Sequence, residues 1–313
     1  MATSELTAFG DRLAAAVRRT GNPVCVGLDP RWEQLPELLT ASVDASDRGQ
    51  RAAAYARFCC GVVDVVGGLV PVVKPQVAFF EQLGAAGMQA LAEVLAYARA
   101  AGLLVIIDAK RNDIGSTAEA YADGFLGALS AWGGDALTVS PYLGDDSLTP
   151  FVETAARRGA GVFVLVKTSN PGGGQFQDLS CDGRPLYVHV AEHVERLAGG
   201  NVGACGYGSI GAVVGATYPQ QMVHLRSVMP HAWFLVPGYG SQGATACDVA
   251  TAFDAHGMGA IVNNSRGIIF AQRRKEYADT FAGSRWQEAV EAATREMIAQ
   301  LRADTPAGRI TAN

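Results

Sequence analysis

Three charged residues follow a hydrophobic run in the middle of the chain. Residues 103–107 read Leu-Leu-Val-Ile-Ile, and Asp108, Lys110 and Asp113 come directly after them. Because side chains two positions apart on a strand lie on the same face, Asp108 and Lys110 are predicted to project together. Charges at the end of an apolar strand are costly unless they pair or act on a ligand. The spacing therefore indicates an active-site edge, and the alternative is a surface ion pair that contributes little.

The composition argues against several classes of protein. Of the 313 residues, 49% are hydrophobic and 18% are charged, so a large core is possible and global disorder is not expected. A net charge of −5 without a long basic run argues against a nucleic-acid or anionic-membrane surface. Since uninterrupted apolar stretches stay shorter than the roughly 18 residues of a membrane span, no such span is expected.

The cysteines and the N-terminal residues indicate a cytoplasmic protein. The six cysteines lack Cys-x-x-Cys spacing, which argues against a zinc site or a disulfide framework and indicates free thiols in a reducing compartment. Charged residues interrupt the apolar positions of residues 1–20. This segment is therefore predicted to form an amphipathic helix and not a signal peptide.

Short runs of β-favouring residues recur along the chain, and helical patterns lie between them. Most of the runs are apolar throughout, which is typical of strands buried on both faces of a parallel sheet. The predicted strands are 24–28, 70–74, 103–107, 136–139, 161–166, 212–214, 233–236 and 260–262. The predicted helices are 50–66, 76–100, 116–131, 146–158, 185–197, 219–228, 244–255 and 284–302.

Eight strand–helix units without a linker predict one α/β domain over residues 1–313, a single (β/α)8 TIM barrel with extended βα loops. The helix of residues 1–20 is expected to pack on this barrel, and residues 284–302 to form a terminal helix. An open doubly wound sheet is the competitor. That fold normally has a glycine-rich dinucleotide loop after its first strand, where this chain has Gly-Leu-Asp-Pro.

Polar side chains gather where the predicted strands end, which is the catalytic face of a barrel. The interior strand segments carry almost no polar residue, so this segregation favours one functional site over scattered surface charges. The polar and glycine residues at these ends are Asp29, Lys74, Asp108, Lys110, Asp113, Ser140, Lys167, Thr168, Ser169, Asn170, Gly238, Gly240, Gln242, Asn264, Ser265, Arg266 and Gly267.

The loops after the seventh and eighth predicted strands are where such barrels often bind phosphate. Residues 237–243 read Pro-Gly-Tyr-Gly-Ser-Gln-Gly, and their glycines let backbone N–H groups approach an anion. Residues 264–267 read Asn-Ser-Arg-Gly, in which Arg266 could hold phosphate oxygens in a bidentate manner. Glycines that only form tight turns are the alternative, and two such loops at the expected strands favour a phosphate site.

The motif Asp108-x-Lys110-x-x-Asp113-Ile114-x-x-Thr117 resembles the signature of the orotidine 5′-phosphate decarboxylase family. Further segments resemble the longer bacterial branch of that family, in matching order from about residue 20 to 275. They are Val-Gly-Leu-Asp-Pro at 26–30, Lys-Pro at 74–75, Thr-Ser-Asn-Pro-Gly at 168–172, Val-Pro-Gly-Tyr-Gly at 236–240 and Asn-Ser-Arg-Gly at 264–267. Related sugar-phosphate barrels share the Asp-x-Lys-x-x-Asp element, so its combination with the other segments is the specific part.

The resemblance implies a carboxy-lyase that converts orotidine 5′-phosphate to UMP and carbon dioxide, the last step of de novo UMP synthesis. It implies a (β/α)8 barrel that forms a homodimer and uses no metal or organic cofactor. Lys74, Asp108, Lys110 and Asp113 are implied to form an alternating charged tetrad in which Lys110 is the proton donor.

The resemblance also implies the substrate contacts. The implied substrate-binding residues are Asp29, Ile114, Thr117, Ser169, Asn170, Pro237, Gly238, Gln242, Arg266 and Gly267. Among them, Ser169 is implied to contact the pyrimidine amide, and Gln242 and Arg266 the phosphate. Ile114 and Thr117, together with Asp113, are implied to reach into the active site of the neighbouring subunit, so that the two sites are shared.

Loss of carbon dioxide would leave negative charge on pyrimidine carbon 6, without a π-system placed to delocalise it. Fixed charges in a water-poor site are therefore predicted to stabilise this carbanion. The ammonium group of Lys110 suits that task, and it can then deliver its proton to the carbon.

Other interpretations of the same residues stay open. Asp29, Asp108 and Asp113 could ligate Mg²⁺ in a metal-dependent sugar-phosphate decarboxylase or aldol-type synthase, although neighbouring lysines disfavour a cation. Lys74 or Lys167 could form a Schiff base, although Lys167 is better interpreted as an ordinary strand-end cation. A nucleotide-binding barrel without catalysis is the remaining alternative, and the intact charged tetrad argues against it.

Overall fold

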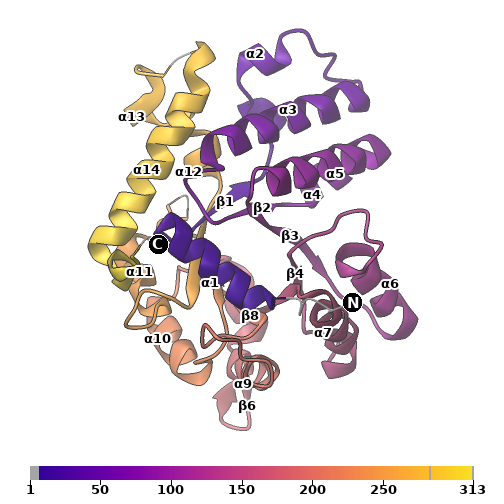
Figure 1. Ribbon diagram of the computed structural model, residues 1–313, viewed down its shortest axis with the longest axis vertical. Helices are drawn as coiled ribbons and strands as arrows, with labels where there is room; N and C mark the ends of the chain where they lie inside the picture. The colour runs from indigo at the N-terminus through magenta and orange to yellow at the C-terminus, as the bar shows by residue number, and fades with distance from the viewer. Residues whose placement is uncertain (1–6, 241, 282, 312–313) are drawn as a thin grey trace, which may run out of the picture.

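The computed structural model describes residues 7–240, 242–281 and 283–311. Eight parallel strands close into a barrel in the order β1-β10-β9-β8-β5-β4-β3-β2, and helices surround it (Figure 1). The barrel strands are β1 (Val24–Leu28), β2 (Val72–Pro75), β3 (Leu104–Arg111), β4 (Ala136–Val139), β5 (Gly161–Lys167), β8 (Ile210–Val214), β9 (Phe234–Val236) and β10 (Ala260–Asn264). The predicted (β/α)8 barrel is confirmed, whereas the assignment of all 313 residues to one domain stays a prediction.

Helices connect the strands and cover the outside of the barrel (Figure 1). The longer helices are α1 (Phe9–Thr20), α3 (Arg48–Val66), α5 (Gly84–Ala100), α6 (Gly115–Leu126), α7 (Asp145–Arg158), α9 (Leu186–Gly199), α10 (Pro219–Val228) and α14 (Trp286–Asp304). The four-residue helices are α2 (Glu37–Thr40), α4 (Ala78–Glu81), α8 (Gly174–Gln177), α11 (Ala246–Val249), α12 (Arg266–Ile269) and α13 (Lys275–Ala278). A small hairpin, β6 (Ser180–Cys181) and β7 (Arg184–Pro185), interrupts the long connection after β5. None of the described helices is long and apolar enough to span a membrane.

Several predicted elements differ from the observed ones. The predicted helix 76–100 is broken into α4 and α5 at Gly84, whose φ of 64° lies in the left-handed region that favours glycine. The predicted helix 116–131 ends at Leu126, because the backbone becomes extended at Gly127. The predicted helix 244–255 is only α11 followed by a 3₁₀ turn. The first six residues of the predicted helix 1–20 lie outside the described part of the chain.

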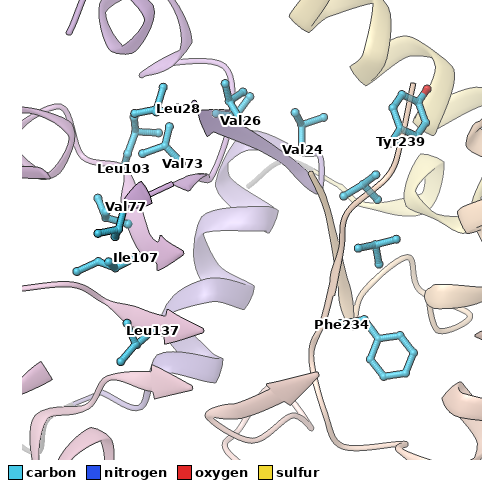
Figure 2. Close-up of a cluster of buried hydrophobic side chains, with 14 of the residues drawn as sticks. Val24, Val26, Leu28, Val73, Val77, Leu103, Ile107, Leu137, Phe234 and Tyr239 are labelled. Atoms are coloured by element: carbon cyan, nitrogen blue, oxygen red, sulfur yellow. The ribbon is translucent and has the colours of Figure 1, made fainter. Parts of the chain in front are cut away.

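Alternate residues of each barrel strand pack on opposite sides of the sheet, as a strand period of two requires. On β1, Val24, Val26 and Leu28 belong to the outer core between the strands and the helices (Figure 2). Cys25, between them in sequence, belongs to a separate core inside the barrel. Both faces of the strand are therefore buried, which explains why it is apolar throughout.

Helix α1 closes the amino-terminal end of the barrel. Phe9, Leu13 and Val17 on this helix belong to the same interior core as Cys25. The ring of Phe9 meets that of Phe163 edge-on at 5.9 Å between centroids. Because this end is filled with apolar side chains, the interior of the barrel can open to solvent only at the carboxyl ends of its strands.

The interior changes from apolar to polar over two residues on four strands. The successive interior positions are Val72 then Lys74 on β2, Ile106 then Asp108 on β3, Ala136 then Thr138 on β4, and Ile261 then Asn263 on β10. The pleat of the strands therefore places one layer of polar side chains directly above the interior core.

Candidate active site

A pocket of about 260 Å³ opens above this polar layer at the carboxyl ends of the strands. It gathers residues that are far apart in sequence, because parallel strands end at the same edge of the barrel. Nine of the predicted site residues line it: Asp29, Lys74, Asp108, Lys110, Ser169, Pro237, Gly238, Gln242 and Arg266.

The centre of the pocket wall is a cluster of alternating charges. Asp108 Oδ2 accepts a hydrogen bond from Lys74 Nζ at 2.6 Å, and Asp108 Oδ1 accepts one from Lys110 Nζ at 2.5 Å. Thr138 Oγ1 also donates to Asp108 Oδ1, at 3.0 Å. Lys74 and Asp108 are buried, whereas the side chain of Lys110 is 45% exposed. Lys110 is therefore the charged member of this cluster that a ligand in the pocket reaches most easily.

The environment keeps Lys74 and Asp108 ionised. Burial by itself would raise the pKa of Asp108, but the ammonium groups of Lys74 and Lys110 outweigh it and hold that pKa well below its usual range. Burial by itself would lower the pKa of Lys74, but the carboxylates of Asp108 and Asp29 outweigh it and raise that pKa. Lys74 and Asp108 thus face the pocket as fixed opposite charges at neutral pH.

The backbone of β3 is irregular at Lys110. Its φ of 49° lies in the left-handed region, and the register with β4 shifts between Ile107 and Arg111. A non-glycine residue in this conformation costs about 1–2 kcal/mol. Strand β3 runs past the predicted end at residue 107, and Asp108 and Lys110 do project together, but a bulge and not a regular pleat sets the direction of Lys110. The Lys110 N–H donates to Thr138 Oγ1 at 2.9 Å, which links the bulge to the charged cluster.

Asp29 lies beside this cluster with one oxygen unused. Its Oδ1 atom is buried and has no hydrogen-bond partner among the described residues. Burial raises the pKa of Asp29, while Lys74 and a hydrogen bond with Ser265 oppose the rise. A side chain on Gly27 would place its Cβ 1.8 Å from Ser265 Oγ, so only glycine there lets Ser265 come this close. The unused oxygen is an acceptor that a ligand hydroxyl could satisfy.

The two loops predicted to bind phosphate both contribute residues to the pocket, at the ends of β9 and β10. Pro237, Gly238 and Gln242 follow β9, and Arg266 begins α12 after β10. Gly238 has a φ of 104°, a conformation that glycine adopts without strain. Ser241 of the predicted loop lies outside the described residues.

Five predicted site residues are absent from the described pocket lining. Asp113 Oδ1 accepts a hydrogen bond from the Ile114 N–H at 2.8 Å, while Ile114 is 57% exposed and Thr117 is exposed on α6. Asn170 accepts from Thr168 Oγ1 at 2.7 Å, and Gly267 packs against the Asn264 side chain. Within one described chain, the implied tetrad is therefore a cluster of three charges.

Sequence reasoning missed four polar residues of the pocket wall. Thr138 and Asn263 could have been found by counting two positions along the strand from the interior residues of β4 and β10. Gln76 directly follows β2, and its place after Lys74 was a usable signal. Arg31, in the loop after β1, lies 5.2 Å from the centre of the Phe79 ring on α4, a contact that strand spacing cannot indicate.

The donor set for the magnesium alternative is not assembled among the described residues. No three His, Cys, Asp or Glu side chains in the described ranges group in a way that could hold a metal ion. Of the three carboxylates considered, Asp113 is outside the pocket lining, and both oxygens of Asp108 accept from ammonium groups. These contacts favour an anionic ligand over a divalent cation.

Known proteins resemble this chain over most of its length. The sequence model of the orotidine 5′-phosphate decarboxylase / HUMPS family matches residues 22–281. The orotidine 5′-phosphate decarboxylase of Rhodopirellula baltica is 59% identical over 298 residues, which cover 94% of this chain and 99% of that protein. The protein of the same name from Deinococcus radiodurans is 45% identical over 250 residues, covering 80% of this chain and 84% of its own. The structure of Leishmania donovani OMP decarboxylase matches with a TM-score of 0.72 and 34% identity, covering 95% of this chain and 98% of that one.

Proposed function

Because the chain belongs to the orotidine 5′-phosphate decarboxylase / HUMPS family, we propose that it converts orotidine 5′-phosphate to UMP and carbon dioxide. The observation that carries this proposal is the cluster of Lys74, Asp108 and Lys110 at the pocket wall. Two ammonium groups held by one buried carboxylate provide the fixed charge that a localised carbanion requires.

The reaction follows from the position of Lys110. The bond between pyrimidine carbon 6 and the carboxylate breaks, carbon dioxide leaves, and the electron pair stays on carbon 6. The Lys110 ammonium stabilises that pair and transfers one proton to it, which forms the C–H bond of UMP and leaves a neutral amine. Water then returns a proton to Lys110. Crowding of the departing carboxylate by Asp108 is a smaller contribution in this account, below carbanion stabilisation.

The rest of the pocket supplies substrate contacts in this proposal. Asp29, with its unused buried oxygen, binds a ribose hydroxyl beside Lys74. Ser169 contacts the pyrimidine amide. Gln242 and Arg266 hold the phosphate, which lies far from the bond that breaks, so that remote binding energy contributes to catalysis. Neighbouring residues on the same loops are assigned as supporting contacts: Asn170 beside Ser169, Pro237 and Gly238 before Gln242, and Gly267 beside Arg266.

We propose that no cofactor is used and that the protein acts in the cytoplasm. The charged cluster provides the stabilisation that a metal would otherwise supply. The six cysteines, all in the described part of the chain, are free thiols, as in proteins of a reducing compartment. The pyrimidine nucleotide is the expected partner, and nucleic acid and membrane are not.

The direct test is turnover by the wild-type protein. We expect the absorbance of orotidine 5′-phosphate to fall with EDTA present and no cofactor added, and UMP and carbon dioxide to form in equal amounts. Activity that EDTA abolishes would favour the metal-dependent alternative. Tight UMP binding without release of carbon dioxide would favour a nucleotide-binding barrel that has no catalytic role.

A homodimer with shared active sites would account for Asp113, Ile114 and Thr117, three of the predicted residues that lie outside the pocket. Asp113, Ile114 and Thr117 follow β3 on the same face as the exposed side chains of Tyr142 and Leu143, which follow β4. Exposed apolar side chains of this kind are typical of an interface. A second copy seated there would bring Asp113 to the charged cluster of its neighbour.

Mixing two inactive variants tests this sharing. Lys110→Ala and Asp113→Ala should each lose activity as separate proteins, because each lacks one charge in every site. Mixed at concentrations that form dimers, they should recover up to about a quarter of wild-type activity, since random pairing gives half hetero-dimers with one intact site each. An inactive mixture that nevertheless contains hetero-dimers would show that each subunit has a self-contained site.

A further inference from the structure

A second buried lysine lies outside the pocket, at the carboxyl end of β5. The side chain of Lys167 is 0% exposed, and its Nζ atom donates to Asp178 Oδ1 at 2.6 Å. The rings of Tyr187 and Tyr218 lie 5.4 and 4.7 Å from this ammonium group. Lys167 is the strand-end cation that the sequence predicts, and its full burial is the unexpected feature, because the long connection after β5 folds back and covers it.

The contacts of Lys167 come from three segments of the chain. Asp178 directly follows α8 in the long connection, Tyr187 lies on α9, and Tyr218 lies in the loop between β8 and α10. Separating a buried cation from its partner strongly destabilises the folded protein. These contacts therefore fix where the three segments meet. The ammonium group therefore joins the connection after β5 to the loop after β8.

The same connection also forms hydrogen bonds with Thr168, the residue that follows Lys167. Gln177, the neighbour of Asp178, accepts from the Thr168 N–H at 3.1 Å and donates from Nε2 to Thr168 Oγ1 at 2.7 Å. A Cβ on Gly173 would lie 2.9 Å from Thr168 Oγ1 and 3.1 Å from Gln177 Oε1, so glycine lets these groups close together. The backbone N–H and the hydroxyl of Thr168 are thus both held by Gln177 on α8.

The loop after β8 holds the next residue from another side. Thr217 Oγ1 donates to the Ser169 carbonyl at 3.2 Å, and the Gly215 N–H donates to the Lys167 carbonyl at 2.7 Å. A Cβ on Gly215 would lie 2.8 Å from Ser169 Cα, so the two backbones approach as closely as a glycine permits. Ser169, which lines the pocket, is therefore fixed by the two segments that Lys167 joins.

We propose that Lys167, Asp178 and Gln177 are positioning residues for recognition of the pyrimidine base. They hold Thr168 and Ser169 at the pocket wall, where Ser169 meets the base, and they do not touch the substrate themselves. This inference rests on the proposed function, in which Ser169 contacts the pyrimidine amide. It assigns a role to the connection after β5 that its sequence does not reveal.

The test compares a ligand that has the base with one that lacks it. Dissociation constants for UMP and for ribose 5-phosphate are measured by calorimetry on wild-type protein, Asp178→Asn and Gln177→Met. We expect the constant for UMP to rise about 3- to 10-fold in both variants, the size of one weakened hydrogen bond. The constant for ribose 5-phosphate should stay unchanged. With orotidine 5′-phosphate, KM should rise more than kcat falls, because the base contact is present in substrate and transition state alike.

Asp182→Asn is the matched control. It removes a carboxylate from the exposed hairpin of the same connection, away from Lys167, and should leave both constants unchanged. Asp178 is 42% exposed, so its variant is expected to fold, and a thermal melt checks this. If Asp178→Asn nevertheless fails to fold, Gln177→Met decides the matter.

Two results would overturn the inference: unchanged UMP affinity in the variants, or an equal loss for both ligands. The second result would mean that the contacts support the fold in general and not the base site. A wild-type protein that does not turn over orotidine 5′-phosphate would instead refute the proposed function. The two failures are therefore distinguishable.

Discussion

Lys74 and Lys167 are both buried at the carboxyl ends of barrel strands, and each lies 2.6 Å from a carboxylate. Their surroundings differ. The partner of Lys74 is Asp108, which is itself buried and holds a second ammonium group that faces the pocket. The partner of Lys167 is the half-exposed Asp178, and two tyrosine rings close over the pair. In the proposed function, the ion pair that lines the pocket acts on the substrate, whereas the pair that aromatic rings enclose holds loops together.

The two sites differ in the number of ammonium groups that each carboxylate binds. In both pairs, the loss of hydration is offset only by close contact with the opposite charge. At Asp108, two cations share one carboxylate, so the Lys110 ammonium group remains at the pocket in addition to the buried Lys74–Asp108 pair. At Asp178, one cation meets one carboxylate, and no net charge remains to act on a ligand.

The same substitution in the two pairs gives the largest expected contrast. Asp108→Asn removes the charge that orders Lys74 and Lys110, and kcat/KM for orotidine 5′-phosphate should fall about 10³-fold, the scale of a broken buried pair. Asp178→Asn should change the same parameter only several-fold. Steady-state kinetics on the two variants, with thermal melts as the folding control, check the prediction. Equal losses in the two variants would remove the distinction between the two lysine sites.

Removing the arginine at the phosphate loops should have an intermediate effect on kcat/KM. Arg266→Ala removes a charged hydrogen-bond donor from the pocket, and kcat/KM for orotidine 5′-phosphate should fall on the order of 10²-fold. Turnover of orotidine, which has no phosphate, should not fall further. Lys275→Ala, at an exposed position on α13, is the control and should behave as wild type. A comparable loss with both substrates would place the role of Arg266 away from the phosphate.

The smallest expected effect concerns ligands without a base. Asp178→Asn should leave the dissociation constant for ribose 5-phosphate unchanged. The predicted order is therefore Asp108, then Arg266, then Asp178. This order follows the distance of each residue from the chemical step in the proposal, from the charged cluster through the phosphate contact to a group that acts only through Ser169.

The barrel could be predicted from sequence because its strands are buried on both faces and therefore read as apolar runs. Lys74 and Asp108 could be identified in the same way, because each is the first charged residue at the end of a predicted apolar strand. On an interior position, such a residue marks where the apolar core inside the barrel ends. The same rule locates Thr138, whose place inside a strand was overlooked. Local pattern is sufficient for features of this kind.

Features that depend on contacts between loops were beyond the sequence. The left-handed backbone at Lys110 has no glycine to indicate it. The burial of Lys167 depends on Asp178, eleven positions later in a connection without a regular pattern. These two features are set by tertiary packing, which overrides local propensity. The break at Gly84 differs, because a glycine with a φ of 64° is a local signal that the prediction of one helix over residues 76–100 overlooked.

In the proposed mechanism, the Lys110 ammonium group stabilises the carbanion and donates the proton. The most direct measurement is the rate of UMP formation by Lys110→Ala beside wild type, with EDTA present and UMP binding measured on both proteins. We expect the wild type to be active and the variant to bind UMP but to form none above the uncatalysed rate. A variant that decarboxylates orotidine 5′-phosphate at the wild-type rate would contradict this mechanism.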